Sequence, residues 1–182
     1  NLYLMYLINT KFKGLKIIQQ KRFGDSRGYL RETFKKKIIK WDNLIFDYAT
    51  VSKKNVLRGF HFNSKYPQAK YVSVLKGKIL DYVIDLRKNS KTFGMTFSII
   101  LSEKNCKSLY IPEGFAHAYY SFSKSNLIYY KLSNYYHPKY EDGIFWNDKN
   151  LKPNWPTNKP ILAKRDKKWG TFLNFKKIYK GF

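Results

Sequence analysis

The chain has 182 residues, enough for one compact domain, and its hydrophobic fraction of 43% excludes disorder as the default state. Its 36 basic and 12 acidic side chains give a net charge of +24. The lysines are scattered from Lys11 to Lys180, and no zinc finger or RNA-recognition motif accompanies them. We therefore ascribe the charge to a general bias in composition and expect no specific nucleic-acid partner, although a small anionic ligand such as a diphosphate fits.

The cysteine content and the hydropathy of the sequence limit the cellular compartments in which the protein is expected. Cys106 is the single cysteine, so no internal disulfide can form and a reducing, cytoplasmic location is expected. No apolar run approaches the roughly 20 residues that span a bilayer, and no signal-peptide pattern opens the chain, so no membrane partner is expected. Residues 1–4 precede a plausible initiator, Met5, and we expect them to be a remnant of expression. A single domain over residues 5–182 is predicted.

Short runs rich in β-branched and aromatic residues follow one another along the chain, separated by turn signals such as Lys76-Gly77. In residues 78–85, Asp81 and Asp85 fall on one face of the strand. Helical periodicity is limited to residues 35–41 and, weakly, to the C-terminus, and residues 134–182 are expected to wrap irregularly. The pattern predicts an all-β, cupin-like jelly roll, a sandwich or barrel with a few short helices. The predicted strands are residues 15–19, 71–75, 79–86, 96–101, 108–111, 117–122 and 127–132.

Three histidines are the first candidates for chemistry. His61 lies in a strand-like run, where alternation predicts Arg58, Phe60 and Phe62 on one face and His61 on the other. His117 lies in a second such run, and His137 lies in a predicted loop. Each of these histidines, taken alone, is more often a packed or solvated residue than a catalyst.

Metal and nucleotide-fold signals are missing from the sequence. A cupin-like metal site needs three or four converging ligands, and it usually includes two histidines that are two residues apart on one strand. Here the residue two positions after His61 is Asn63, and the residue two positions after His117 is Tyr119. There is no glycine-rich phosphate loop and no dinucleotide fingerprint, which argues against a kinase or a hydride-transfer enzyme. We expect no metal and no cofactor. The residues alone indicate a basic jelly roll with a possible His/Lys/Tyr site.

Several motifs, weak singly but specific in their order and spacing, resemble the dTDP-4-dehydrorhamnose 3,5-epimerase family. The resemblance extends from about Lys11 to Asp166. The matching stretches are residues 23–28 with Glu32, 52–62, 67–70, 85–87, 92–94, 111–117, 130–131, 134–136, 143–148 and 164–166.

The resemblance implies a jelly-roll homodimer that inverts carbons beside the keto group of a nucleotide-linked 4-keto sugar without metal or cofactor. By resemblance His61 is the base, and Asp166 holds its other ring nitrogen. Lys70 neutralises the enolate, because a proton beside a ketone is acidic only if that oxygen is stabilised. Tyr130 returns a proton from the opposite face.

The family's substrate-binding positions carry over with the same resemblance. An aromatic residue that stacks on the nucleotide base corresponds to Tyr136. Arginines suit a diphosphate because their forked donors match phosphate oxygens. Exchange of an N-terminal strand between subunits is expected to bring Arg27 and Glu32 into the partner's site. The full binding set is Arg27, Tyr29, Glu32, Arg58, His117, Tyr136, Glu141 and Arg165.

Departures from the family cluster around the substrate. Phe46 and Tyr48 stand where the family commonly carries glutamine and asparagine, Asn63 replaces a glutamine, and Tyr29 replaces a phenylalanine. The proposed base, acid and enolate stabiliser are untouched. We therefore expect the reaction type to hold for a dTDP- or GDP-linked 4-keto sugar, with a GDP-linked sugar or a heptose as candidates in place of the thymidine-linked 6-deoxyhexose.

Three alternatives stay open. The chain could be a sugar-nucleotide binding protein or inactive paralogue, a 3,4-ketoisomerase on a related jelly roll, or a basic nucleic-acid binder, for which only weak, salt-sensitive association is expected. For an epimerase, the product is expected to feed a surface polysaccharide such as a capsule or lipopolysaccharide, or a glycosylated metabolite. The sequence alone does not distinguish inversion at C3, at C5 or at both.

Overall fold

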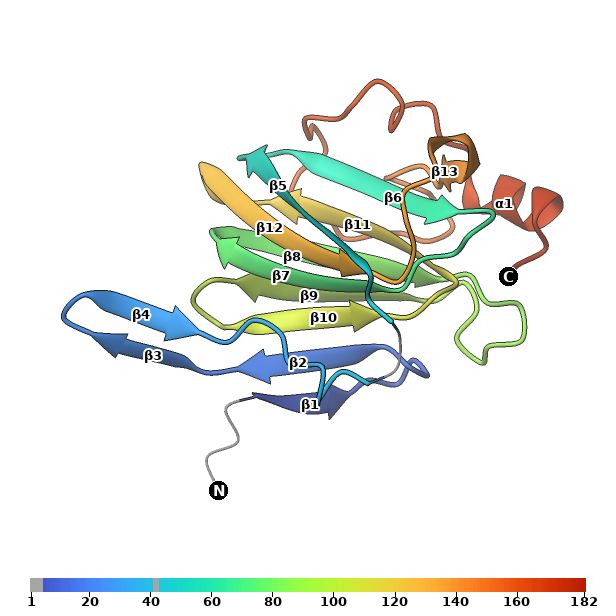
Figure 1. Ribbon diagram of the computed structural model, residues 1–182. Coiled ribbons are helices and arrows are strands. Elements are labelled where there is room, and N and C mark those ends of the chain that lie inside the picture. Colours follow the sequence, from blue (N-terminus) through green and yellow to red (C-terminus); the bar gives the residue numbers. More distant parts are fainter. Residues whose placement is uncertain (1–4, 41–42) are drawn as a thin grey trace.

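Two antiparallel β-sheets pack face to face in the computed structural model, which describes residues 5–40 and 43–182 (Figure 1). The sheets form an open sandwich and do not close into a barrel. The larger sheet has the order β1 (Met5–Asn9), β2 (Lys16–Gln20), β10 (Lys107–Ile111), β7 (Lys70–Lys76), β12 (Ser125–Leu132) and β5 (Phe46–Lys53). The smaller sheet has the order β13 (Glu141–Gly143), β6 (Leu57–Asn63), β11 (Phe115–Ser121), β8 (Lys78–Asp85) and β9 (Thr96–Ser102).

The inner faces of the two sheets meet in one hydrophobic core. Val72 on β7 and Ile128 on β12 pack with Val83 on β8, and all three are fully buried. Alternation along each strand sends every second side chain to this core. The seven strand runs predicted from the sequence are therefore confirmed, because each combines β-branched or aromatic residues with a buried face.

Two chain segments cover the outer faces. The C-terminal segment lies over the smaller sheet, where Trp155, Phe172 and Phe175 pack on Phe60 and Phe62. It is largely irregular, as expected, and contains a 3₁₀ turn, η1 (Pro138–Tyr140), and a short helix, α1 (Phe172–Ile178). The larger sheet is covered by the segment after residue 32, through contacts of Phe34 and Ile39 with Tyr71.

The helix expected at residues 35–41 is wrong over its described part. Residues 36–38 form a single turn, in which the N–H groups of Ile38 and Ile39 both donate to Lys35 O at 3.0 Å. Three successive lysines repel one another, and one buried side chain, Ile39, does not offset the cost of propagating a helix. Trp41 and the expected expression remnant, residues 1–4, lie outside the described residues.

A β-bulge in β6 changes which side chains share a face. His117 pairs with His61, but two residues further along β11 Tyr119 pairs with Arg58, so β6 has one extra residue in this interval. An extra residue reverses the alternation beyond it. The prediction that Arg58 lies on the face opposite His61 is therefore wrong, because both side chains line the same cavity.

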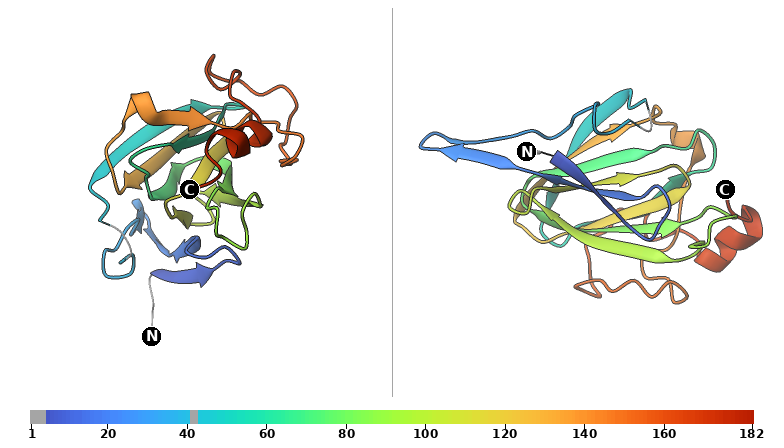
Figure 2. Two further views of the ribbon diagram at one scale, coloured as in Figure 1. Left: turned by 90° about the vertical axis from the view of Figure 1, so that its right-hand side faces the viewer. Right: turned by 90° about the horizontal axis from the view of Figure 1, so that it is seen from below.

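A two-stranded hairpin, β3 (Arg22–Asp25) and β4 (Gly28–Arg31), projects from the body of the molecule (Figures 1 and 2). Its side chains are mostly exposed, including Tyr29 at 50% and Leu30 at 62%. The hairpin therefore presents apolar surface that the described part of the chain does not cover.

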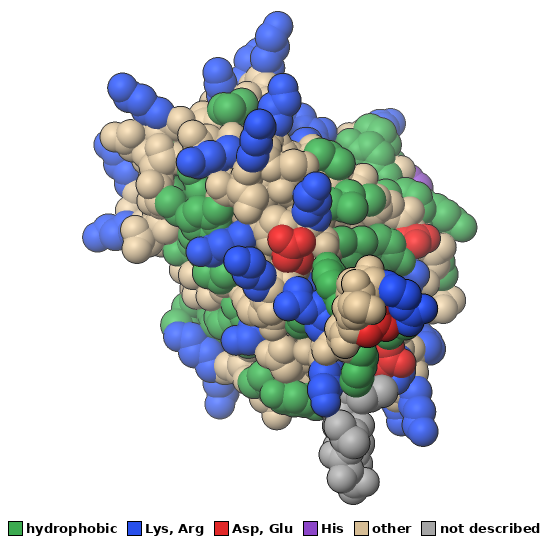
Figure 3. All heavy atoms as spheres, turned by 90° about the vertical axis from the view of Figure 1, so that its left-hand side faces the viewer, with side chains coloured by type: hydrophobic (Ala, Val, Ile, Leu, Met, Phe, Trp, Pro, Cys, Tyr) green, Lys and Arg blue, Asp and Glu red, His purple; other side chains and the backbone are tan. Residues whose placement is uncertain are grey.

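The positive charge is dispersed over the face of the molecule that Figure 3 shows. On the face seen in Figure 3, lysine and arginine side chains are scattered among hydrophobic and neutral ones and form no continuous stripe. This distribution agrees with a compositional bias. No helix described in the structure has both the length and the apolar composition needed to cross a bilayer.

Candidate active site

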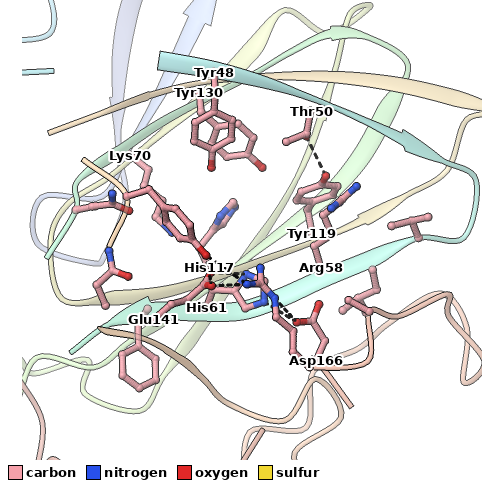
Figure 4. Close-up of a pocket in the computed structure, with 18 of the residues that line it drawn as sticks. Tyr48, Thr50, Arg58, His61, Lys70, His117, Tyr119, Tyr130, Glu141 and Asp166 are labelled. Carbon is pink, nitrogen blue, oxygen red and sulfur yellow. Dashed lines mark hydrogen bonds and ion pairs between the residues drawn. The ribbon is translucent and has the colours of Figure 1, made fainter. Parts of the chain in front are cut away.

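A cavity of about 580 Å³ lies between the two sheets (Figure 4). Strands β5, β7 and β12 of the larger sheet form one wall, and β6, β11 and β13 form the other, with the irregular C-terminal segment beside them. The four proposed catalytic residues all line it, together with five of the eight proposed binding residues. These nine residues are Arg58, His61, Lys70, His117, Tyr130, Tyr136, Glu141, Arg165 and Asp166.

His61 forms a dyad with Asp166. Its Nε2 lies 2.7 Å from Asp166 Oδ1, and Asp166 also accepts the backbone N–H of Gly59 at 3.4 Å and the indole N–H of Trp169 at 3.2 Å. Burial raises the pKa of this carboxyl, but the hydrogen bond and charge of His61, together with the hydrogen bonds from Gly59 and Trp169, outweigh that effect, so its pKa lies below the usual value. A buried, ionised Asp166 fixes the imidazole ring and leaves Nδ1 facing the cavity.

Tyr130 lies on the opposite wall from His61 (Figure 4). Its ring is 3% exposed and stacks on Tyr48, its Cα partner on β5, with ring centroids 4.9 Å apart. Burial raises the pKa of Tyr130 well above its usual value and that of Tyr48 to about 12. Both phenols are therefore protonated at neutral pH and can donate a proton or a hydrogen bond into the cavity.

Lys70 is the first residue of β7, in the same wall of the cavity as Tyr130. Burial lowers its pKa to about 8, while the charges of Glu141 and Asp81 oppose the shift. The ammonium group is therefore mostly charged at pH 7, in surroundings of low dielectric where a positive charge strongly stabilises an anion.

A second histidine–carboxylate pair lies at the cavity floor. His117 Nε2 is 2.9 Å from Asp81 Oδ2, and both side chains are buried. Burial raises the pKa of Asp81, and its Oδ1 has no hydrogen-bond partner among the described residues. The sequence placed Asp81 on one strand face but gave no sign of this pairing, which depends on the register of β8 with β11, where His117 opposes Val83.

Charged and aromatic groups form the rim. Glu141 Oε2 accepts a hydrogen bond from Tyr136 at 2.8 Å and forms an ion pair with Arg165. Arg58 donates to Ser52 Oγ at 3.1 Å, and Ser52 is in turn 2.9 Å from Tyr119 Oη. The rim therefore offers two guanidinium groups and an exposed tyrosine ring beside the catalytic candidates.

Arg27, Tyr29 and Glu32 do not line this cavity. Arg27 lies in the turn of the β3–β4 hairpin and pairs with Asp25 at 2.7 Å, and Glu32 follows β4 and pairs with Lys35 at 2.5 Å. Within this chain these three residues are thus separate from the other binding candidates.

Three lining residues were not among the site residues expected from the sequence. Thr50 and Tyr119 are uncharged members of ordinary strand stretches, and only the fold brings them to the cavity, whereas Gln68 lies in the matched stretch 67–70 without a role assigned to it. Gln68 donates to Asn134 O at 3.0 Å and so anchors the loop that carries Tyr136. The described part of the chain contains no group of three or more His, Cys, Asp or Glu side chains arranged to hold a metal ion.

The open, cupin-like β-sandwich places the chain in the class of cupin-like epimerases, which are isomerases that act on sugar nucleotides. The particular family follows from the sequence. A sequence model described as dTDP-4-dehydrorhamnose 3,5-epimerase matches residues 9–174, and the chain belongs to this family.

Relatives of known name agree with this membership. The dTDP-4-dehydrorhamnose 3,5-epimerase of Methanothermobacter thermautotrophicus is 38% identical over 89% of this chain and 91% of its own. The epimerase of Legionella pneumophila, solved with dTDP-4-keto-L-rhamnose, is 38% identical with a TM-score of 0.87, over 92% of both chains. The epimerase of Bacillus anthracis, solved with TDP and pyrophosphate, is 33% identical with a TM-score of 0.88, over 92% of this chain and 99% of its own.

Proposed function

We propose that the protein epimerises a nucleotide-linked 4-keto sugar at C3, at C5 or at both, through an enolate and without a cofactor. The observation that carries this proposal is the position of His61 and Tyr130 on opposite walls of one cavity (Figure 4). An inversion requires a base on one face of the carbon and an acid on the other. The chain's own residues supply both, as well as a charge for the enolate oxygen.

The first step breaks the C–H bond beside the ketone. Because Nε2 of His61 is hydrogen-bonded to Asp166, Nδ1 of His61 carries the lone pair that takes the proton. The electron pair of the C–H bond moves into the enolate. Asp166 stabilises the imidazolium that forms, as carboxylates do in other histidine dyads.

The enolate oxygen then needs positive charge close by. Lys70 supplies it from a partly buried position at the start of β7, where electrostatic stabilisation is stronger than in water. His117, held by Asp81 at the floor of the cavity, is a second hydrogen-bond donor. The enolate collapses when Tyr130 delivers its phenolic proton to the other face of the carbon, which inverts the centre.

The substrate differs, in this proposal, from the thymidine-linked 6-deoxyhexose bound by the Legionella relative. Phe46 and Tyr48 line the cavity as aromatic rings where the family pattern has amides. Without two hydrogen-bonding amides, the cavity recognises different substituents on the sugar. The guanidinium groups of Arg58 and Arg165 still suit a diphosphate, and Tyr136 a nucleotide base. A GDP-linked 4-keto sugar or a 4-keto heptose fits this pattern.

The test is incubation in heavy water with thymidine- and guanosine-linked 4-keto hexoses and with a guanosine-linked 4-keto heptose. Deuterium at C3 or C5 identifies the substrate and the inverted carbons. Labelling with the thymidine-linked hexose alone refutes the altered substrate, and no labelling of any substrate refutes epimerisation. A 3-keto product would favour a ketoisomerase, and exchange unchanged in a His61→Asn variant would favour a binding protein.

We also propose a homodimer in which the β3–β4 hairpin completes the partner's site. Two observations support it: the hairpin projects from the body with uncovered apolar side chains, and Arg27, Tyr29 and Glu32 lie on or beside it, away from their own cavity (Figure 2). Burying that hairpin on a second subunit removes its apolar surface from water.

The product of the reaction would serve as a sugar donor precursor for a surface polysaccharide.

A further inference from the structure

His61 has a carboxylate near each ring nitrogen. Asp166 holds Nε2 at 2.7 Å, and Glu141 Oε1 lies 3.8 Å from Nδ1, the nitrogen assigned above to proton abstraction. The distance to Glu141 is longer than a hydrogen bond, so one water or a small rotation of the side chain joins the two groups. Arg165 lies near both carboxylates, 3.7 Å from Asp166 Oδ1, and the rings of Trp169 and His61 form a T-shaped pair.

The two oxygens of Glu141 have different surroundings. Oε2 is held by the Tyr136 hydroxyl and the Arg165 guanidinium, whereas Oε1 has no hydrogen-bond partner among the described side chains and points toward His61. Strand β13 sets this position, since Glu141 pairs with Asn63 and Gly143 pairs with His61. The Glu141 side chain is 11% exposed, and that of Arg165 is 50% exposed. The carboxylate thus bridges the buried base and the open rim.

The proposed reaction leaves a proton on Nδ1 after each abstraction. A second inversion cannot begin, and the enzyme cannot reset, until this proton leaves. The His61 side chain is only 17% exposed, and a sugar bound against Nδ1 covers what remains. Direct transfer to bulk water is therefore blocked while substrate is bound.

Resting on the proposed function, we propose that Glu141 is the proton exit of His61. Oε1 takes the proton from Nδ1 and passes it to water at the rim, while Tyr130 is reprotonated from solvent. One proton leaves on the His61 side and one enters on the Tyr130 side, so the inversion is balanced without an oxidant or a co-reactant.

The rate at which the His61 proton exchanges with solvent is measured most directly in a Tyr130→Phe background. There the opposite face cannot be protonated, so deuterium from heavy water enters the substrate only through His61, with the configuration retained. We expect Tyr130→Phe/Glu141→Gln to exchange at least about tenfold more slowly than Tyr130→Phe at saturating substrate, because the amide accepts no proton. Glu141→Asp in the same background retains a carboxylate and is expected to recover part of the rate.

Tyr130→Phe/Tyr136→Phe is the matched control, because it removes a hydrogen bond to the same carboxylate but leaves the carboxylate in place. Its KM is expected to rise, with a much smaller loss of exchange at saturation. Equal exchange rates in Tyr130→Phe and Tyr130→Phe/Glu141→Gln would overturn the proposal and leave Glu141 as a binding residue. Absence of exchange in Tyr130→Phe itself would refute the proposed function instead. Thermal unfolding of each variant checks that it is folded.

Discussion

At the scale of single residues, burial sets the charge of the group that faces the enolate. The pKa of Lys70 is lowered to about 8, so the side chain is mostly charged at pH 7 and mostly neutral at pH 9. We expect kcat to fall as the pH rises through about 8, because a neutral amine cannot neutralise the enolate. In Lys70→Arg this alkaline fall should vanish, since arginine stays charged, whatever the absolute rate. A pH profile that is the same in both proteins would contradict this role.

Tyr48 is the residue at which the cavity differs most clearly from the family pattern. Its ring stacks on Tyr130, so Tyr48→Phe keeps the wall, whereas Tyr48→Asn restores the family's amide and opens space. We expect Tyr48→Asn to shift the ratio of kcat/KM values toward the thymidine-linked hexose by about 10–200-fold, the usual range for reshaping a pocket. Tyr48→Phe should shift it far less. If both variants keep the original ratio, Tyr48 does not determine the substrate.

At the scale of strands and turns, the connection between β7 and β8 depends on one glycine. Gly77 has a φ of +86°, and a Cβ there would lie 2.6 Å from Asn126 Oδ1. That oxygen accepts the Lys78 N–H, and the amide of Asn126 donates to Ser52 O on β5. The turn between β7 and β8 is therefore tied to β12, which carries Asn126, and through it to β5.

We expect Gly77→Ala to lower the free energy of unfolding by at least about 2 kcal/mol, through left-handed strain and the clash with Asn126. In a chain of this length that corresponds to a fall in Tm of about 4–8 °C. Gly24→Ala is the control, because its nearest contact, Gly28 O at 3.4 Å, is ordinary. Equal Tm values for the two variants, measured by thermal unfolding, would show that the turn tolerates a side chain.

The properties of individual strands explain which of them could be predicted from the sequence. Strands such as β8 and β12 were predictable because each is a short run rich in β-branched and aromatic residues. Strand β5 was not, because it is an edge strand with an exposed Asp47 and few buried side chains. Nor could the place of Arg58 be foreseen, since a single extra residue in β6 moves it to the other face.

The candidate site depended still more on the fold. His61 and Asp166 are 105 positions apart, and no local pattern joins them. Their grouping with Lys70 and Tyr130 was expected only from the family resemblance. The contact of Glu141 with the reactive face of His61 required β13, a three-residue strand too short to leave a pattern in the sequence.

At the scale of the whole molecule, the β3–β4 hairpin tests the proposed dimer. If Arg27 acts in the partner's cavity, each site takes His61 from one subunit and Arg27 from the other. Co-expressed Arg27→Ala and His61→Asn chains would then form mixed dimers with one intact site, giving about a quarter of the wild-type sites overall. We expect this recovery of activity, while each variant alone stays nearly inactive. No recovery in isolated mixed dimers would place Arg27 outside the partner's site.

The opposed base and acid are tested most directly by following deuterium and configuration together at the carbons beside the ketone. We expect Tyr130→Phe in heavy water to exchange hydrogen for deuterium with retention of configuration, because His61 still removes the proton. His61→Asn should lose both exchange and inversion by about 10²–10⁴-fold. Inversion by Tyr130→Phe near the wild-type rate, or exchange by His61→Asn at that rate, would contradict the proposed pair.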